Sequence, residues 1–331
     1  MPIFILIVAL LLGFAPSSSW AAPSVANAQR EVDRLRTLAA EKYEAANEAT
    51  IRIKQLEQQT AVLENRESAL RKELDAAGLT LSRIAISQYT DSGLGQGLDL
   101  LFSSDPSKYL ADAGALDMVT RKYAQQLREF AVKKQNVEAT QLVVADRTSL
   151  LRAERVKLNR QVAAAKEDLA KAQRILNNLK KEDRDRLAKL EADRENKILS
   201  ESKKYAQSYK GDNTRGSIAL KYALAQVGDV YVWAAAGPTR WDCSGLTMRS
   251  FQQAGVSLPH SSRIQIKYGK NISSSSLKPG DLLFFGKPIS HVSMYMGGGK
   301  MVQAPRPGKK VEVVNFTKMF GKKPFVGARR L

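Results

Sequence analysis

Apolar side chains recur every seven positions in two long segments, residues 29–90 and 106–205. Glu, Lys, Arg and Gln fill the positions between them, and neither segment contains an internal proline. This spacing is typical of helices that pair as coiled coils, because a seven-residue repeat keeps one apolar seam facing a partner helix. The seam residues are Leu56, Leu63, Leu70, Ala77 and Ile84 with Ile53, Leu74 and Leu81 in the first segment, and Leu151, Leu158, Ala165, Ala172 and Leu179 with Val162, Leu169, Leu176 and Leu190 in the second.

The stretch between the two helical segments interrupts the repeat. Residues 91–97 are rich in glycine, and residues 104–106 (Ser-Asp-Pro) supply capping side chains and a first-turn proline for the second helix. The simplest geometry folds the two helices back on each other, which predicts a coiled-coil hairpin domain over residues 29–205. Its tip, residues 89–118, exposes the apolar residues Leu98, Leu100, Leu101 and Phe102. These form either a locally packed connection or a contact surface for a membrane partner or for the protein's own catalytic domain.

The N-terminal segment has the pattern of an export signal. Residues 3–14 are almost all apolar, a run too short to cross a bilayer as a helix of roughly 20 residues. Small side chains at Ser19 and Ala21 offer a cleavage site, so residues 1–21 are predicted to be a signal peptide and the protein to be secreted. No Lys or Arg precedes the apolar run, and a buried strand or an uncleaved anchor is the alternative.

The composition changes after the second helical segment. Residues 206–216 lose the apolar repeat and are predicted to be a flexible linker, and residues 217–331 a small compact domain. The chain has 52 Lys and Arg against 33 Asp and Glu, and the part from Gly211 onward has 18 against 5. This charge either is an ordinary solvated surface or favours an anionic cell wall. Export and the lack of a nucleic-acid-binding motif argue against nucleic acid as a partner.

Cys243 is the only cysteine in the chain, which excludes a disulfide framework and any multi-cysteine zinc site. It begins a segment with helical spacing, residues 243–254. The N–H groups and the positive dipole at a helix N-terminus favour thiolate over thiol, which predicts a lowered pKa and a nucleophilic role. The alternative is a buried cysteine that acts as a small apolar residue. In an exported protein, an unpaired thiol is a liability unless its reactivity is used.

A nucleophilic cysteine requires a base, and the chain offers only His260 and His291. His291 begins an alternating segment that is followed by a glycine turn, residues 297–299, and a return strand ending near Gln303. A three-residue hairpin loop would place His291 and Gln303 on the same face, within side-chain reach. Gln303 could then accept a hydrogen bond from His291 Nδ1–H and turn Nε2 toward the sulfur. A two-residue loop would place the two side chains on opposite faces.

Several short motifs in the C-terminal third resemble a known family. They are residues 231–233 (Tyr-Val-Trp), 242–246 (Asp-Cys-Ser-Gly-Leu), 258–262 (Leu-Pro-His-Ser-Ser), 277–282 (Leu-Lys-Pro-Gly-Asp-Leu) and the hairpin that begins at His291. Together they resemble the NlpC-type cell-wall peptidases, which are papain-like cysteine endopeptidases of peptidoglycan stem peptides. The resemblance covers residues 217–331. It implies an α+β fold in which an antiparallel sheet packs on the helix that carries the cysteine.

The resemblance also implies roles for single residues. The nucleophile falls on Cys243, the base on His291, the third polar residue on Gln303, and the active-site tyrosine on Tyr231, where it would bind substrate or stabilise the oxyanion. Asp242 and Ser244, which flank the nucleophile, are further candidates for substrate binding or oxyanion stabilisation. The chain departs from the family in two ways: Gln303 is neutral, and residues 234–235 are alanines where a glycine pair is more usual. No metal or other cofactor is expected.

These observations together predict an exported D,L-endopeptidase that cleaves stem peptides after a γ-linked D-glutamyl residue, in cell-wall remodelling and division. The helical segments resemble, less specifically, the coiled coils of RipC-like and PcsB-like division hydrolases. That resemblance implies docking on a membrane complex of the FtsE–FtsX type and autoinhibition by the coiled coil. The alternative is a catalytically silent scaffold that binds peptidoglycan and recruits other division proteins.

Overall fold

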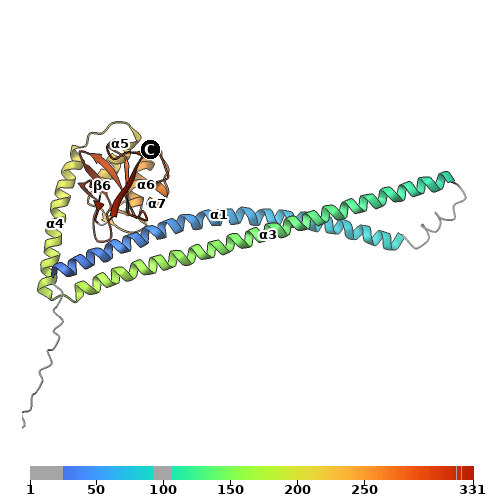
Figure 1. Ribbon diagram of the computed structural model, residues 1–331, viewed down its shortest axis with the longest axis horizontal. Coiled ribbons are helices and arrows are strands. Elements are labelled where there is room, and N and C mark those ends of the chain that lie inside the picture. The colour runs from blue at the N-terminus through green and yellow to red at the C-terminus, as the bar shows by residue number, and fades with distance from the viewer. Residues whose placement is uncertain (1–24, 92–105, 318, 322) are drawn as a thin grey trace, which may run out of the picture.

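The computed structural model describes residues 25–91, 106–317, 319–321 and 323–331. A long helical hairpin and a small domain with an antiparallel sheet lie side by side (Figure 1). This is the predicted fold class, which is thereby confirmed. In the described residues, no helix is both long enough and apolar enough to span a membrane. The expected signal segment and the apolar residues expected at the tip, which lie within residues 98–102, fall outside the described residues.

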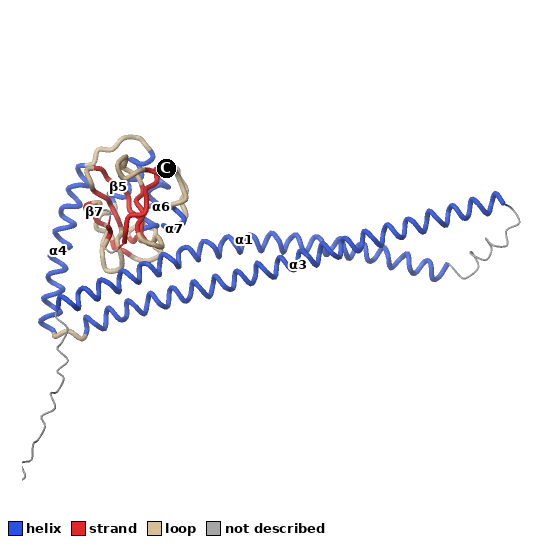
Figure 2. The backbone as a smooth tube through the Cα atoms, viewed as in Figure 1, coloured by secondary structure: helices blue, strands red, loops and turns tan. Residues whose placement is uncertain are grey.

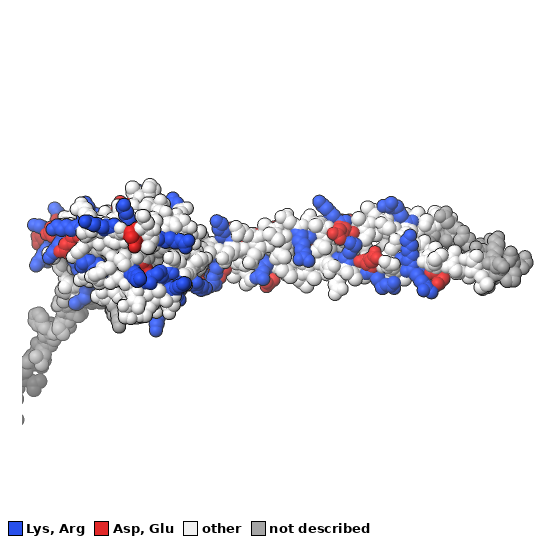
Figure 3. Space-filling model, turned by 90° about the horizontal axis from the view of Figure 1, so that it is seen from above, with Lys and Arg blue, Asp and Glu red and all other residues white. Residues whose placement is uncertain are grey.

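Helices α1 (Val25–Asp91) and α3 (Pro106–Asn177) form the two arms of the hairpin and run antiparallel. The predicted seam residues are half-buried or buried along both arms, as expected for a pair of helices that share one apolar stripe. Near the open end, Val32 and Leu35 form a buried apolar cluster with Ala172, and Ala39 and Tyr43 form another with Ala165. Both signs of charge are mixed along the hairpin surface, whereas Lys and Arg predominate over the small domain (Figure 3).

The second helical segment differs from the prediction, because it is divided. Helix α3 ends at Asn177, and a separate helix, α4 (Lys181–Ser208), turns away from the hairpin and lies along the small domain (Figure 2). The Ser202 hydroxyl accepts a hydrogen bond from the backbone N–H of Val313 at 2.8 Å and lies 3.2 Å from the backbone oxygen of the same residue. Leu190, expected in the coiled-coil seam, is 54% exposed in this arrangement.

The expected linker, residues 206–216, is mostly ordered by local contacts. Helix α4 continues to Ser208, and helix α5 (Arg215–Ala225) begins soon after, with Thr214 as its N-cap. Tyr209 and Ser217 lie on either side of the connection, and their hydroxyl oxygens are 2.9 Å apart. The path from the hairpin to the small domain is therefore a packed helix with a short connection, and it is much less free than the sequence pattern predicts.

The small domain is built on a sheet of strand order β3-β9-β4-β5-β6-β7, whose strand pairs are all antiparallel. A short parallel pair, β1 with β2, precedes the cysteine-bearing helix α6, and α5 and α6 pack together on one face of the sheet. Trp241, Phe251, Leu282 and Phe284 are among the buried side chains of this core. The elements are β1 (Val230–Tyr231), β2 (Arg240–Trp241), α6 (Cys243–Gln253), α7 (Ser262–Gln265), β3 (Lys270–Ile272), β4 (Leu282–Phe285), β5 (His291–Gly297), β6 (Lys300–Gln303), β7 (Glu312–Asn315), β8 (Met319–Phe320), which pairs with β9, and β9 (Lys323–Arg330).

Candidate active site

Cys243 is the first residue of helix α6, as the sequence predicts. Asp242 is the N-cap, and its side chain accepts a hydrogen bond from the backbone N–H of Gly245 at 2.7 Å. The helix packs on strand β5. The candidate nucleophile thus lies beside the start of the strand that carries His291.

His291 and Gln303 are brought together by the β5–β6 hairpin. Met294 pairs with Val302 and Tyr295 with Met301, and this register places Oε1 of Gln303 2.8 Å from Nε2 of His291. Near the turn the register shifts, because Gly297 pairs with Lys300 where a pair between residues 296 and 300 was expected. The bulge absorbs this difference, so the predicted proximity holds. The predicted ring orientation is wrong, because Nε2 and not Nδ1 faces Gln303.

Gln303 has a second partner that the sequence did not indicate. Its Nε2 donates a hydrogen bond to Oε1 of Glu312 at 3.0 Å, across the pair that strands β6 and β7 form at these two residues. Glu312 is partly buried, and burial is the main reason that its pKa is raised above the ordinary value. The neutral Gln303 therefore links His291 to a carboxyl group.

Asp242 is more than a neighbour of the nucleophile. One of its oxygens accepts the backbone N–H of Ala234 at 2.8 Å, and the other lies 2.7 Å from Nε2 of His260. Ala234 adopts a positive φ of 58°, a conformation that favours glycine, which explains why a glycine pair is more usual here. Asp242 therefore links the loop before the candidate nucleophile to His260.

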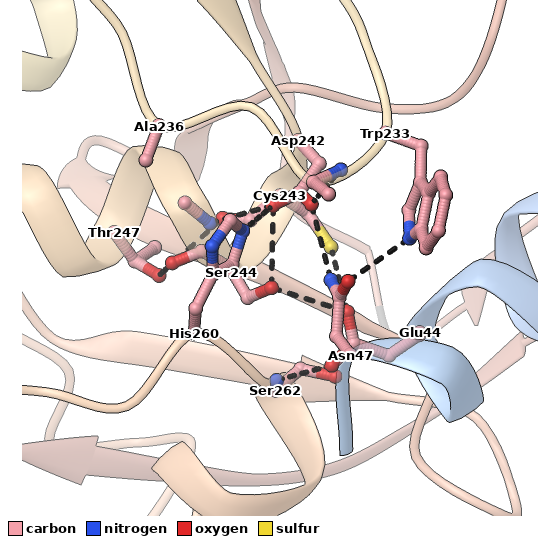
Figure 4. Close-up of polar contacts among 12 residues, drawn as sticks. Glu44, Asn47, Trp233, Ala236, Asp242, Cys243, Ser244, Thr247, His260 and Ser262 are labelled. Carbon is pink, nitrogen blue, oxygen red and sulfur yellow. Dashed lines mark hydrogen bonds and ion pairs between the residues drawn. The ribbon is translucent and has the colours of Figure 1, made fainter. Parts of the chain in front are cut away.

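Helix α1 lies directly over the nucleophile. The Glu44 carboxylate accepts hydrogen bonds from the backbone N–H of Ser262 and from the Ser244 hydroxyl at 3.2 Å (Figure 4). It also accepts a long contact from the Cys243 thiol at 3.8 Å. We call the surface formed by Trp233, Asp242, Cys243, Ser244 and Ser262 the active-site face. Glu44 is 2% exposed and Cys243 is 5% exposed, so α1 covers this face.

The neighbouring turn of α1 completes the contact with the active-site face. The Trp233 ring stacks on Tyr43 with centroids 4.5 Å apart, and Nε1 of Trp233 donates to Oδ1 of Asn47 at 2.9 Å. Nδ2 of Asn47 in turn donates to Oδ2 of Asp242 at 3.1 Å. Ion pairs surround this centre: Arg263 with Glu48 at 3.1 Å, Arg306 with Asp33 at 2.7 Å, and Lys323 with Glu41 at 3.4 Å.

Comparison with known proteins finds a family for the small domain. Residues 228–330 match the NlpC/P60 family. The small domain is an NlpC/P60 domain. Over 120 residues the chain is 43% identical to a probable endopeptidase of Mycobacterium tuberculosis, covering 36% of this chain and 30% of that protein. It is 44% identical over 95 residues to the probable endopeptidase p60 of Listeria monocytogenes, covering 28% and 20%. The match thus spans less than a third of these relatives.

Solved structures give the same family by name. The NlpC/p60 domain of the peptidoglycan hydrolase SagA is 34% identical, covers 35% of this chain and 98% of that one, and aligns with a TM-score of 0.32. NlpC2 of Trichomonas vaginalis is 29% identical, covers 35% and 46%, and aligns with a TM-score of 0.34.

The electrostatics of the NlpC/P60 domain under α1 differ from the prediction of a lowered thiol pKa. Burial, with the Glu44 and Asp242 carboxylates next, raises the pKa of Cys243 well above the ordinary value. Burial lowers the pKa of His291 to about 3, and the nearby Lys323 charge contributes. Both changes favour the neutral side chain. With α1 in place, the NlpC/P60 domain therefore holds a thiol at Cys243 and a neutral imidazole at His291.

Tyr231 and Ser244 lie close to Cys243 in the NlpC/P60 domain. Burial is the main reason that the pKa of Tyr231 is raised well above the ordinary value, so its hydroxyl stays protonated. Ser244 is fully buried, and its hydroxyl is bound to Glu44 at 3.2 Å and to Asp242 at 3.3 Å. Sequence reasoning missed Glu44, Asn47, Glu312 and Lys323, which contact or lie near the predicted site residues.

Proposed function

We propose that this protein is a cysteine endopeptidase of peptidoglycan stem peptides. The observation that carries the proposal is the position of Cys243 at the start of α6, which packs on the strand that carries His291. Nε2 of His291 lies 2.8 Å from Oε1 of Gln303 on the next strand. The endopeptidase names of relatives 43% and 44% identical to the domain support it. The specific bond, the amide after a γ-linked D-glutamyl residue, follows from the resemblance of the motifs.

The proposed reaction proceeds through an acyl-enzyme. His291 takes the proton of Cys243, and the thiolate attacks the carbonyl carbon of the scissile amide. His291 then gives its proton to the leaving amine as the C–N bond breaks, and a thioester remains on Cys243. Water attacks the thioester while His291 accepts a proton, which releases the γ-carboxylate and restores the thiol. Tyr231 and Ser244 are proposed to contact the substrate once the active-site face is open.

We further propose that α1 inhibits the enzyme by occupying the active-site face. Glu44 fills the space against Cys243 that the substrate carbonyl would need, and the raised pKa of Cys243 keeps the nucleophile protonated. A partner that binds the hairpin only when α1 has left the face would shift the population toward the open enzyme. Exposed apolar residues far from the domain, among them Leu79, Ile86 and Leu142, support a contact with a membrane complex of the FtsE–FtsX type. The export signal would place the protein outside the cytoplasm, at the cell wall, and its action in wall remodelling and division.

The reaction can be tested with a variant designed to free the face, Tyr43→Ala/Asn47→Ala, which we call the release variant. Incubated with peptidoglycan or with a γ-D-glutamyl tripeptide, it should generate a new free γ-carboxylate and a new amine, identified by mass spectrometry. Prior alkylation with iodoacetamide should stop the reaction, because Cys243 is the only thiol in the chain. Retention on peptidoglycan without new peptide ends would support the scaffold and contradict the peptidase.

A further inference from the structure

Lys323 is a buried cation near the proposed catalytic pair, and neither the family resemblance nor the reaction above uses it. It is the first residue of β9 and is 5% exposed. The adjacent strands bring it to the same end of the sheet as His291, because Phe325 of β9 pairs with Phe285 of β4, which pairs with His291. Its ammonium group lies 3.4 Å from the Glu41 carboxylate of α1.

A cation at this place disfavours catalysis unless an anion accompanies it. Lys323 contributes to the low pKa of His291, which opposes the imidazolium that must protonate the leaving amine. Burial lowers the pKa of Lys323 itself, and the Glu41 and Glu44 carboxylates oppose this change. Both carboxylates belong to α1 and leave with it. The open enzyme would then hold the Lys323 ammonium group without its ion-pair partner.

The two acidic residues of α1 indicate what the open face would accept. Glu41 and Glu44 are three residues apart, so they lie on one side of the helix and present neighbouring carboxylates to the domain. One carboxylate is held by the Ser262 N–H beside Cys243 and the other by Lys323. The helix therefore places a carboxylate beside Lys323 and also blocks the nucleophile. A substrate with a carboxylate near the scissile bond would place an anion at the same position beside Lys323.

We propose that Lys323 is a specificity residue that binds a carboxylate on the substrate residue following the scissile amide. His291 protonates the leaving amine, so the residue that carries this amine lies on the His291 side, where Lys323 also lies. A diamino acid with a second carboxylate in its side chain provides the matching anion, and a lysine residue does not. The inference rests on the proposed function and adds the identity of the third residue of the stem peptide.

The experiment compares three peptides that differ only after the γ-D-glutamyl residue: meso-diaminopimelate, its side-chain carboxamide, and L-lysine. The full-length release variant should cleave the free acid at least tenfold faster than the other two, measured as kcat/KM. Adding Lys323→Met should remove this preference mainly through KM for the acid. Adding Lys310→Met is the matched control, because it removes the same charge from a lysine that pairs with Glu195 on α4 at 3.8 Å.

Each outcome separates the specificity assignment from the function itself. Equal cleavage of the acid and the amide by the release variant would overturn the role of Lys323 and leave the peptidase intact. A loss of rate for all three peptides with Lys323→Met would also overturn it, since that pattern belongs to a residue that supports the reaction itself. No cleavage of any peptide by the release variant would overturn the proposed function and this assignment together.

A second inference comes from the other side of His291. An amide side chain has an oxygen at one end and an NH2 group at the other, and either could face the imidazole. The Glu312 carboxylate can only accept a hydrogen bond, so it attracts Nε2 of Gln303 and turns Oε1 toward His291. Nε2 of the ring must then carry the proton, which leaves the lone pair on Nδ1.

We infer that Glu312 is a positioning residue that sets the tautomer of His291 through Gln303. Nδ1 becomes the nitrogen that takes the thiol proton. This agrees with the structure, in which Nε2 faces Gln303, and reverses the sequence prediction that Nδ1 would face Gln303. The carboxylate also favours the imidazolium through the polarised amide, a contribution that the neutral Gln303 cannot make alone.

The test uses ¹⁵N NMR of the imidazoles, which is simple to assign because the chain has only two histidines. In the release variant, Glu312→Leu should convert His291 from one tautomer to a mixture and lower kcat by about tenfold to hundredfold with little change in KM. Glu312→Gln should retain more activity, because its amide oxygen can still accept from Gln303. Asn315→Leu at the other end of β7 is the control. An unchanged His291 tautomer in Glu312→Leu would overturn the inference. An unchanged kcat in both Glu312→Leu and Glu312→Gln would overturn it as well.

Discussion

His291→Ala in the release variant should lower kcat/KM by at least about 10³-fold, because it removes both the base for Cys243 and the acid for the leaving amine. His260→Ala should cost far less. His260 contacts Asp242 at 2.7 Å and supports the N-cap of α6. Burial opposes the charged form of His260, but the hydrogen bond to Asp242 and the Asp242 and Glu44 charges outweigh it, so its pKa is raised. Gln303→Ala should fall between the two, since the base remains but loses its orienting partner. Steady-state cleavage of a γ-D-glutamyl peptide measures all three.

The comparison of the two histidines contains its own control. Both variants lose an imidazole, so a general effect of removing this side chain would appear in both. Circular dichroism should show that each variant keeps the fold. Equal losses in folded His260→Ala and His291→Ala would mean that the base has been assigned to the wrong residue. Substantial turnover by His291→Ala would contradict the mechanism as a whole.

The parts of the site that the sequence predicts are those set by short-range pattern. Cys243 follows a capping aspartate and begins an amphipathic helix, so its place at a helix N-terminus is local information. His291 and Gln303 belong to one hairpin, so counting residues through the turn is enough to bring them together. Counting cannot give the ring orientation, because it depends on which atom of Gln303 faces the imidazole. Glu312, one strand further on, makes that choice.

The covering of the active-site face by α1 depends on contacts between residues about 200 positions apart, and the seven-residue repeat carries no information about them. Glu44 is one of many charged residues in this helix, and the expected autoinhibition by the coiled coil did not indicate which residues would make the contact. A local signal does exist, however. Ala39, Ala40, Ala45, Ala46 and Ala49 are all buried, which means that the helix is covered on most sides over this stretch. A cluster of small residues in a charged coiled coil therefore marks the place where a third surface packs.

The same contacts explain why the thiol pKa was predicted with the wrong sign. A helix N-terminus lowers the pKa of a cysteine that water can reach. Here α1 excludes water and brings the Glu44 carboxylate to 3.8 Å from the sulfur, and these effects outweigh the helix. The prediction describes the domain without α1, and the structure describes the domain beneath it. We therefore attribute the difference in the pKa of Cys243 between these two states to the proposed inhibition by α1.

The release variant itself should be at least tenfold more active than the unmodified full-length chain. Tyr43→Ala removes the stack on Trp233, and Asn47→Ala removes hydrogen bonds to Trp233 and Asp242. Such contacts contribute about 0.5–1.5 kcal/mol each, so losing them shifts the opening equilibrium by roughly one to three powers of ten. Neither residue takes part in the proposed chemistry, so a gain in rate reports access to Cys243. Peptide cleavage and the rate of alkylation of Cys243 by iodoacetamide should rise together.

A matched control is available in the far part of the hairpin, where Tyr123→Ala/Asn136→Ala makes the same two changes on α3 away from the domain. This variant should resemble the unmodified chain in both assays. If the release variant gave the same rates as this control variant in both assays, α1 would not limit access to Cys243 in solution. Faster alkylation with no gain in cleavage would show that α1 covers the thiol but that its departure alone does not produce an active enzyme. A rise in both rates, confined to the release variant, would identify the contact of Tyr43 and Asn47 with the active-site face as the restraint that an activating partner has to break.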